Sequence, residues 1–126
     1  MTKPELEQHL VELCRKWQRI LRLQDWDIKV QVSYDLGSYQ AESCYKLPKR
    51  MAIIKVIHPD AYQERNFLWP QDMEESLVHE LLHLHLAAWQ ADDERTMEWV
   101  AKEQAIEAIA RALVELDRKE VPGHAQ

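Results

Sequence analysis

The chain has 126 residues, of which 16 are Lys or Arg and 22 are Asp or Glu, so its formal net charge is −6 at pH 7. This length fits one domain, and a hydrophobic content of 46% excludes a wholly disordered protein. The acidic balance argues against a broad nucleic-acid surface, and the two glycines form no Gly-rich phosphate-binding loop.

The first part of the chain predicts a helix followed by a small sheet. Apolar residues at helical spacing indicate an amphipathic helix over residues 4–23. Alternating polar and apolar residues predict a strand over 26–34, and two more strands are expected over 39–46 and 51–57. Because the connections are short, we expect an antiparallel meander. The strand at 51–57 is either a free edge that binds a peptide by strand addition or an interior strand.

The second part of the chain predicts two long helices. Residues 59–71 are expected to form an irregular linker. Asp72, with Glu75 three residues later, is a candidate N-cap for a strongly apolar, and therefore central, helix that runs to about Trp89. A last helix is expected from about Glu94 to Leu116, and its alanine stripe favours close helix–helix packing. We predict an α+β domain over residues 1–118 and a flexible tail over 119–126.

Two further features concern the environment of the protein. No segment approaches the roughly 18 apolar residues of a membrane span, and no signal peptide opens the chain. Cys14 and Cys44 are too few for a disulfide framework and are expected to be reduced thiols. We therefore predict a cytoplasmic protein without membrane or nucleic-acid partners.

The central helix contains the sequence His79-Glu80-Leu81-Leu82-His83, which is an HExxH motif. Four residues make slightly more than one helical turn, so both imidazoles project from one face and can bind one zinc ion. Glu80 lies beside the metal, where it can take a proton from bound water. His85 lies about 200° round the helix from His83 and is expected to be packed or hydrogen-bonded instead of a ligand.

A catalytic zinc site needs a third protein ligand. The metzincin pattern would place glycine at 86 and histidine at 89, where this chain has Leu86 and Trp89. A carboxylate of the last helix is the remaining option, and the candidates are Glu94, Glu98, Glu103 and Glu107. Glu98 stays an alternative because it lies on the alanine stripe. Glu107 also stays a candidate, although Arg111 four residues later would equally suit an exposed ion pair with it.

The segment from Val78 to His83, followed by Glu103-Gln104-Ala105-Ile106-Glu107, resembles the gluzincins, the thermolysin-like class of zinc peptidases. The resemblance implies that Glu103 is the third zinc ligand. It also implies that Glu107, in place of the usual aspartate, orients a zinc-binding histidine. The order of elements resembles the minimal gluzincins and the small metallopeptidase-like proteins of phages and mobile elements. It implies a zincin-like α+β fold with a small, three-stranded, mostly antiparallel sheet.

The function implied by this resemblance is that of a zinc metallopeptidase acting on a peptide or protein substrate. Zinc held by His79, His83 and Glu103 would lower the pKa of its bound water toward about 7, and Glu80 would act as general base. One further donor to the oxyanion is needed, and the candidates are Tyr34, Tyr39, Tyr45, Tyr62 and His58.

The alternative is a zinc-binding regulatory or interaction module without proteolytic activity. It stays open because thermolysin-like enzymes have a further subdomain that walls the cleft, and the chain is too short to hold one. In the minimal gluzincins a C-terminal tail can cover the cleft as a pro-segment. The resemblance places residues 120–126 in that role, with His124 as a candidate fourth ligand.

Overall fold

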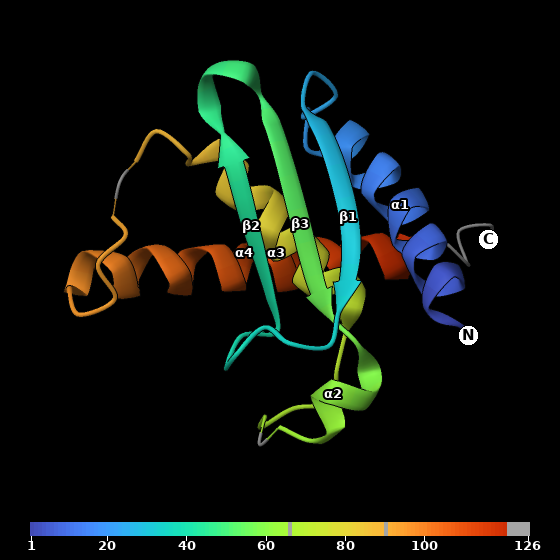
Figure 1. Ribbon diagram of the computed structural model, residues 1–126. Coiled ribbons are helices and arrows are strands. Elements are labelled where there is room, and N and C mark those ends of the chain that lie inside the picture. The colour runs from blue at the N-terminus through green and yellow to red at the C-terminus, as the bar shows by residue number, and fades with distance from the viewer. Residues whose placement is uncertain (66, 90, 121–126) are drawn as a thin grey trace.

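The computed structural model describes residues 1–65, 67–89 and 91–120 (Figure 1). Within them the chain forms an α+β fold with four α-helices, one short 3-10 helix and a three-stranded sheet. The elements in chain order are α1 (Lys3–Ile20), β1 (Asp27–Ser33), β2 (Ala41–Lys46), η1 (Leu47–Lys49), β3 (Met51–Ile57), α2 (Pro59–Gln63), α3 (Met73–His85) and α4 (Met97–Glu120). No helix in this part of the chain is long and apolar enough to cross a bilayer.

The sheet has the strand order β1-β3-β2, so the expected antiparallel meander is wrong. β3 pairs with β2 in antiparallel orientation and with β1 in parallel orientation, which makes the sheet mixed instead of mostly antiparallel. The composition of β3 explains this strand order. β3 has only one polar residue, Lys55, so it suits the central position between two other strands. β3 is therefore the interior strand, and its interpretation as a free edge is wrong. The exposed edges belong to β1 and β2.

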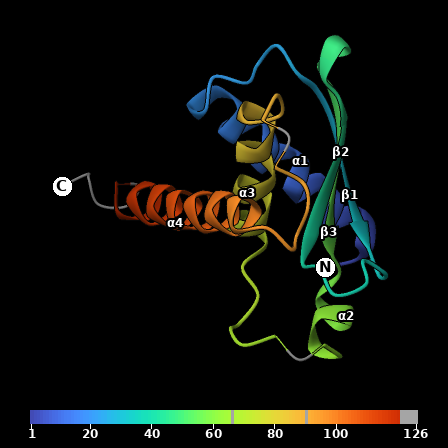
Figure 2. The same cartoon turned by 90° about the vertical axis from the view of Figure 1, so that its left-hand side faces the viewer.

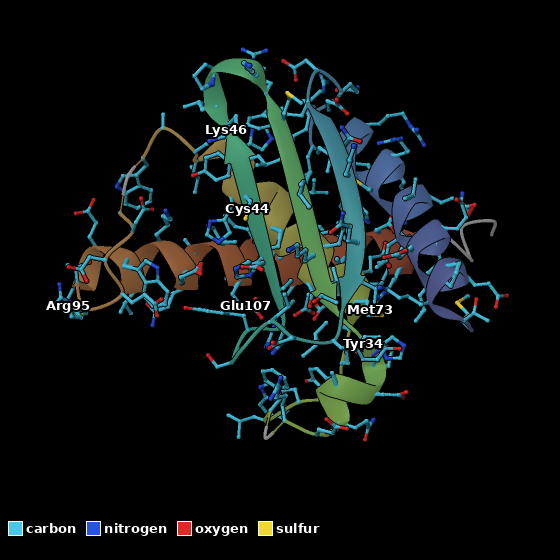
Figure 3. The ribbon with its side chains drawn as sticks, in the orientation of Figure 1. Tyr34, Cys44, Lys46, Met73, Arg95 and Glu107 are labelled. Atoms are coloured by element: carbon cyan, nitrogen blue, oxygen red, sulfur yellow. The ribbon has the colours of Figure 1, made fainter. Side chains whose placement is uncertain are left out.

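The three long helices, α1, α3 and α4, lie on one side of the sheet, and the short α2 lies beyond one end of it (Figure 2). α1 and α3 pack directly on it, and α4 crosses α3 on the side away from the strands. The core between these layers holds side chains from α1, β3, α3 and α4, among them Trp17, Ile54, Leu81 and Val114. The opposite face of the sheet is exposed: it carries Cys44 and Lys46 of β2, labelled in Figure 3. Cys44 and the buried Cys14 are both free thiols.

The helix boundaries differ from the expected ones where capping decides them. α1 begins at Lys3, because Thr2 and Glu5 form a capping box, and it ends at Ile20, three residues before the expected end. A short helix, α2, replaces the start of the expected linker. It begins because Pro59 suits a first-turn position and the His58 ring accepts a hydrogen bond from the Asp60 N–H.

Capping also sets the ends of the two long helices. Asp72 caps α3 as expected, although the Glu75 side chain pairs with Arg111 and does not complete a capping box. α3 ends at His85 and not near Trp89. α4 begins at Met97 and not at Glu94, because Thr96 Oγ1 accepts a hydrogen bond from the Trp99 N–H.

The far end of α4 bears on the expected domain boundary. The helix runs to Glu120, so it includes Lys119 and Glu120, the first two residues of the expected tail. The rest of that tail, with His124, lies outside the described residues. The division of the chain into a domain over 1–118 and a tail over 119–126 stays a prediction.

Candidate metal centre

α3 presents His79 and His83 on the side that faces α4. The helix forms because Asp72 caps it and because four apolar side chains anchor its other side in the core: Leu77, Val78, Leu81 and Leu84. The two histidines are one turn apart, with ring centroids separated by 5.2 Å, and both are half-buried. The prediction that both imidazoles share one helix face is confirmed.

Glu103 of α4 completes a cluster with these two histidines. Its Oε2 atom lies 3.4 Å from His79 Nε2 and 3.1 Å from His83 Nε2. One ligand atom from each of the three residues lies within 4.8 Å of the other two. Glu103 Oε2 is buried, yet neither contact has the geometry of a hydrogen bond. A buried carboxylate oxygen without a donor is costly, so this atom calls for a positively charged partner.

A metal ion fits this arrangement. Two ligand atoms that each lie about 2.0–2.1 Å from one tetrahedral ion are roughly 3.4 Å apart, close to both nitrogen–oxygen separations in the cluster. An ion would also satisfy the orphaned Glu103 Oε2. Two imidazoles and a carboxylate suit Zn²⁺ and other divalent transition metals. The His-His-Glu group could therefore hold a metal ion, with the identity of the ion left open by the donor set.

Glu107 orients one of the two imidazoles. Its Oε1 lies 2.8 Å from His79 Nδ1, and its Oε2 accepts a hydrogen bond of 3.0 Å from Arg111 Nε. In the neutral ring, a proton held on Nδ1 by this carboxylate leaves the Nε2 lone pair directed at the cluster. The ion pair with Arg111 exists too, so the two interpretations of Glu107 left open by its sequence are compatible.

The electrostatics of the cluster reflect its burial and its opposite charges. Burial alone would lower the pKa of His79, but Glu103, Glu80 and Glu107 raise it to about 9. The adjacent imidazoles of His79 and His83 hold the pKa of Glu103 well below its usual range. The carboxylates around His79 therefore stabilise a positive charge in the cluster, and Glu103 stays ionised. A bound cation would be stabilised by the same carboxylates.

Glu80 is the most buried acidic side chain of this region, with 8% of its surface exposed. Burial raises its pKa, and the nearby His79, His83 and the Ser43 hydroxyl oppose that rise. Ser43 comes from β2, so the edge strand of the sheet approaches the HExxH helix at this point. A carboxyl group whose pKa is raised toward neutrality is suited to accept and release a proton.

The cluster opens into a cavity of about 870 Å³. The side chains that matter for its chemistry, His79, Glu80 and Glu103, form part of the lining. α3 and α4 supply two of its walls, and the chain from Ser38 to Ala41 together with Phe67 supplies the rest. The protein therefore has a cleft without a separate subdomain, because the loop before β2 takes the place of the missing wall.

The structure separates the rival ligand candidates from the cluster. Glu98 accepts a hydrogen bond of 2.7 Å from Trp89 Nε1, and Glu94 accepts one of 2.5 Å from the Tyr39 hydroxyl. His85 is exposed and its Nε2 lies 2.6 Å from the Leu21 carbonyl oxygen, so the expectation that it is hydrogen-bonded is confirmed.

The structure also separates the candidate oxyanion donors. Tyr34 stacks on His58, Tyr45 lies against Trp26, and the Tyr62 hydroxyl donates to the Trp69 carbonyl. Tyr39 is the only one of the five candidates that lines the cavity. Its hydrogen bond to Glu94 raises its pKa, and the charge of Glu103 adds to this effect.

Ser43 is the residue of this region that the motif analysis missed. It lies 37 positions before Glu80 in the chain, and its closeness depends on the register of β2 on β3 and on the packing of α3 against the sheet. No spacing rule links the two positions, so only the tertiary structure identifies the pair.

No family model, no curated protein and no solved structure matches this chain. The chemistry of the site therefore has to follow from its own donors, distances and burial.

Proposed function

We propose that the protein is a zinc-dependent metallopeptidase of the gluzincin type, with a zincin-like fold. The observation that carries the proposal is the convergence of His79, His83 and Glu103 on one point, beside a cleft that His79, Glu80 and Glu103 line. Three protein ligands are the usual set of a catalytic zinc site, which leaves a position open for water or substrate. A purely structural zinc site is normally closed by four protein ligands.

The chemistry divides between the ion and the chain. A bound zinc ion would polarise the scissile carbonyl and make water more acidic. Glu80 accepts a proton from the attacking water and returns it to the leaving nitrogen, a role that suits a buried carboxylate with a raised pKa. Glu107 holds His79 in the orientation that its role as ligand requires.

Tyr39 is the proposed donor to the oxyanion. It lines the cavity together with Glu103, whereas the other four candidates have partners elsewhere. Its hydroxyl donates to Glu94 in the structure, so it has to leave this carboxylate in order to reach a substrate. Substrate binding would then exchange one hydrogen-bond acceptor of Tyr39 for another.

β2 is the proposed docking edge for the substrate backbone. It is an edge strand, and its first residue, Ala41, lines the cavity. The unpaired backbone groups of an edge strand can add an extended peptide by main-chain hydrogen bonds. A peptide added there would run past Ser43 and Glu80 and would bring one of its peptide bonds to the metal centre.

Two measurements test the proposal. Metal analysis of the purified protein should find about one zinc per chain, and His79→Ala should lose it. On a broad peptide library, Glu80→Gln should lower kcat by about 10²–10⁴-fold while zinc content stays unchanged. The matched control is Glu12→Gln, which makes the same substitution at an exposed position of α1 and should leave both values as they are.

The outcomes separate the classes of function. Absence of zinc in the wild-type protein contradicts the metal centre itself. Zinc bound in full with no turnover of any peptide contradicts the peptidase and leaves a metal-binding regulatory or interaction module. A Glu80→Gln variant as active as the wild type contradicts the role of the general base.

A further inference from the structure

One side of α4 is apolar and exposed over four turns. The residues that form this apolar face of α4 share two properties, an apolar side chain and an exposed position, and they are Ala101, Ala105, Ala108, Ile109, Ala112 and Leu116. Ile109 is 49% exposed and Leu116 is 55% exposed. Their spacing of three and four residues keeps them in line over about 22 Å.

Nothing in the described part of the chain covers this face. α3 is the only described element in extended contact with α4, and it packs on the side that carries Glu103, Ala110 and Val114. The alanine stripe favoured close packing against another helix, and inside the described fold that helix is not found. An apolar helix face of this length normally has a partner.

The two ends of the face carry opposite charges. Glu98 lies three residues before Ala101, and Lys119 lies three residues after Leu116. Both are exposed and both continue the line of the face. Glu98 uses its Oε1 atom to accept the hydrogen bond from Trp89 Nε1, so its Oε2 atom is available to a second partner.

The face is also symmetric about its centre, which lies between Ala108 and Ile109. Each member has a counterpart at the same distance on the other side: Ala105 matches Ala112, Ala101 matches Leu116, and Glu98 matches Lys119. A two-fold axis through this centre therefore places every member opposite its counterpart on a second, antiparallel helix. An interface of this kind is self-complementary, as a two-fold symmetric dimer requires.

We propose that α4 is a dimerisation helix that binds α4 of a second copy of this chain in antiparallel orientation. Alanines at the centre allow the two helix axes to approach closely. The Glu98 carboxylate of each copy pairs with the partner's Lys119, so the dimer has one ion pair at each end. A parallel pair would place Glu98 beside the partner's Glu98, and this repulsion favours the antiparallel arrangement.

The dimer also bears on the cleft. Ala108 and Ala112 belong to the apolar face and to the lining of the cavity. The helix of the second copy would therefore lie along the rim of the cleft and extend its wall. The proposal needs neither zinc nor peptidase activity, so it goes beyond the proposed function and stands or fails independently of it.

Sedimentation equilibrium of the full chain tests the assembly. The interface is small, so we expect a dissociation constant in the micromolar range and a mass that rises from 15.0 kDa toward about 30 kDa with concentration. Ile109→Glu places two carboxylates next to the axis and should abolish the rise without unfolding an exposed position. Gln8→Glu adds the same charge on the exposed side of α1 and should leave the dimer unchanged.

A charge exchange tests the antiparallel register. Glu98→Lys alone and Lys119→Glu alone each place like charges at both ends, so each should weaken self-association at least several-fold. An equimolar mixture of the two variants should recover the wild-type association, because both ends of the mixed dimer are again opposite in charge.

Three outcomes would overturn the proposal. A wild-type mass of 15.0 kDa at every concentration up to about 500 µM means that this face serves a different partner. A dimer that Ile109→Glu leaves intact uses another surface. A mixture that associates no better than its two components contradicts the antiparallel pairing of Glu98 with Lys119.

Discussion

His79 uses both ring nitrogens, and this double use organises the metal centre. Nδ1 meets the Glu107 carboxylate at 2.8 Å, and Nε2 faces Glu103 Oε2 at 3.4 Å. His83 uses only Nε2 in the cluster, 3.1 Å from the same oxygen. The ring of His79 is therefore held from both sides, and its orientation depends on a carboxylate that does not itself belong to the ligand group.

Replacement of Glu107 should show how much this orientation contributes. Glu107→Gln removes the charge that holds the proton on Nδ1, so metal affinity should fall by about 10–100-fold. Competition with a chromophoric chelator measures the affinity. Glu98→Gln is the matched control, because it makes the same change on the same helix, outside the cluster. Equal affinities of the two variants would show that Glu107 serves only its ion pair with Arg111.

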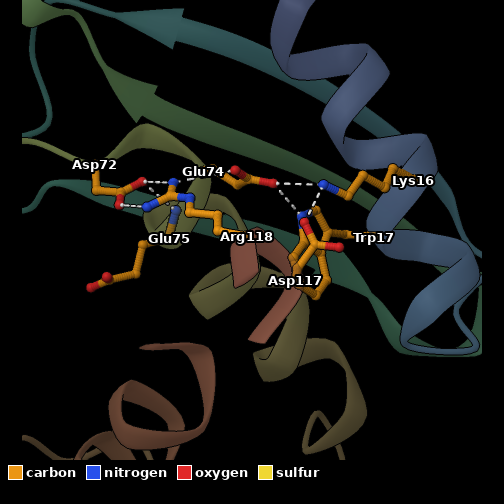
Figure 4. Close-up of polar contacts among 7 residues, drawn as sticks. All are labelled: Lys16, Trp17, Asp72, Glu74, Glu75, Asp117 and Arg118. Atoms are coloured by element: carbon orange, nitrogen blue, oxygen red, sulfur yellow. Dashed lines mark hydrogen bonds and ion pairs between the residues drawn. The ribbon is translucent and has the colours of Figure 1, made fainter. Parts of the chain in front are cut away.

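At the scale of the elements, a charged cluster joins the end of α4 to the start of α3 and to α1 (Figure 4). Arg118 donates to both oxygens of Asp72, at 2.8 and 3.0 Å, and also to Glu74. The other oxygen of Glu74 accepts hydrogen bonds from Trp17 Nε1 and Lys16 Nζ. These contacts hold α4 at one position along the axis of α3. The position of α4 determines which of its glutamates lies beside the histidines.

Asp72→Asn isolates the charge of this cluster, because asparagine is an equally good N-cap. Burial would raise the pKa of Asp72, but Arg118 and the Glu75 N–H lower it overall. A depressed folded-state pKa stabilises the fold above the unfolded-state pKa of about 3.9, and this contribution is lost as the pH falls through the folded-state value. We expect Asp72→Asn to lower the free energy of unfolding by about 0.5–1 kcal/mol at pH 7 and by progressively less below about pH 4.

Urea unfolding of both proteins between neutral pH and about pH 3 measures this difference. Asp27→Asn is the control, since Asp27 is exposed on β1 and takes part in none of the ion pairs of the cluster. A deficit that is the same at every pH would mean that the charge of Asp72 is not its cause.

At the scale of the whole molecule, the candidate metal centre lies between α3 and α4, which also meet by packing and through the ion pairs of Arg111 and Arg118. Its ligands come from α3 and α4, and the lining of the cleft adds the loop before β2 and Phe67. The described residues thereby form a cavity of about 870 Å³. An ion bound there would hold α4 on α3, so the metal should stabilise the whole fold.

Thermal unfolding should therefore depend on zinc. A ligand at about one hundred times its dissociation constant stabilises the native state by about 2.7 kcal/mol, which for a domain of this size raises Tm by roughly 10 °C. His83→Ala should lose this shift. His85→Ala should keep it, because His85 lies on the same helix outside the cluster. A zinc-dependent shift that survives in His83→Ala would place the ion elsewhere.

Features that depend on neighbouring residues could be predicted from the sequence. The HExxH spacing places His79 and His83 on one face of α3, since a helical turn is a local geometry. β1 follows from its local alternation of polar and apolar residues, and Asp72 as N-cap follows from its own side chain. The resemblance to gluzincins also selected Glu103, whereas the spacing of the glutamates alone left Glu98 and Glu107 open.

Features that depend on contacts between distant segments of the chain could not be predicted in this way. The packing of α4 on α3 brings Glu103 to the histidines and leaves Glu98 with Trp89. The insertion of β3 between β1 and β2 makes the sheet mixed and leaves β2 as the edge near the cleft. Strand periodicity is the same for parallel and antiparallel neighbours, and helical periodicity does not say which helix lies opposite. Burial of the shared hydrophobic core determines both the orientation of the strands and the helix that packs opposite. This burial involves side chains from the whole chain.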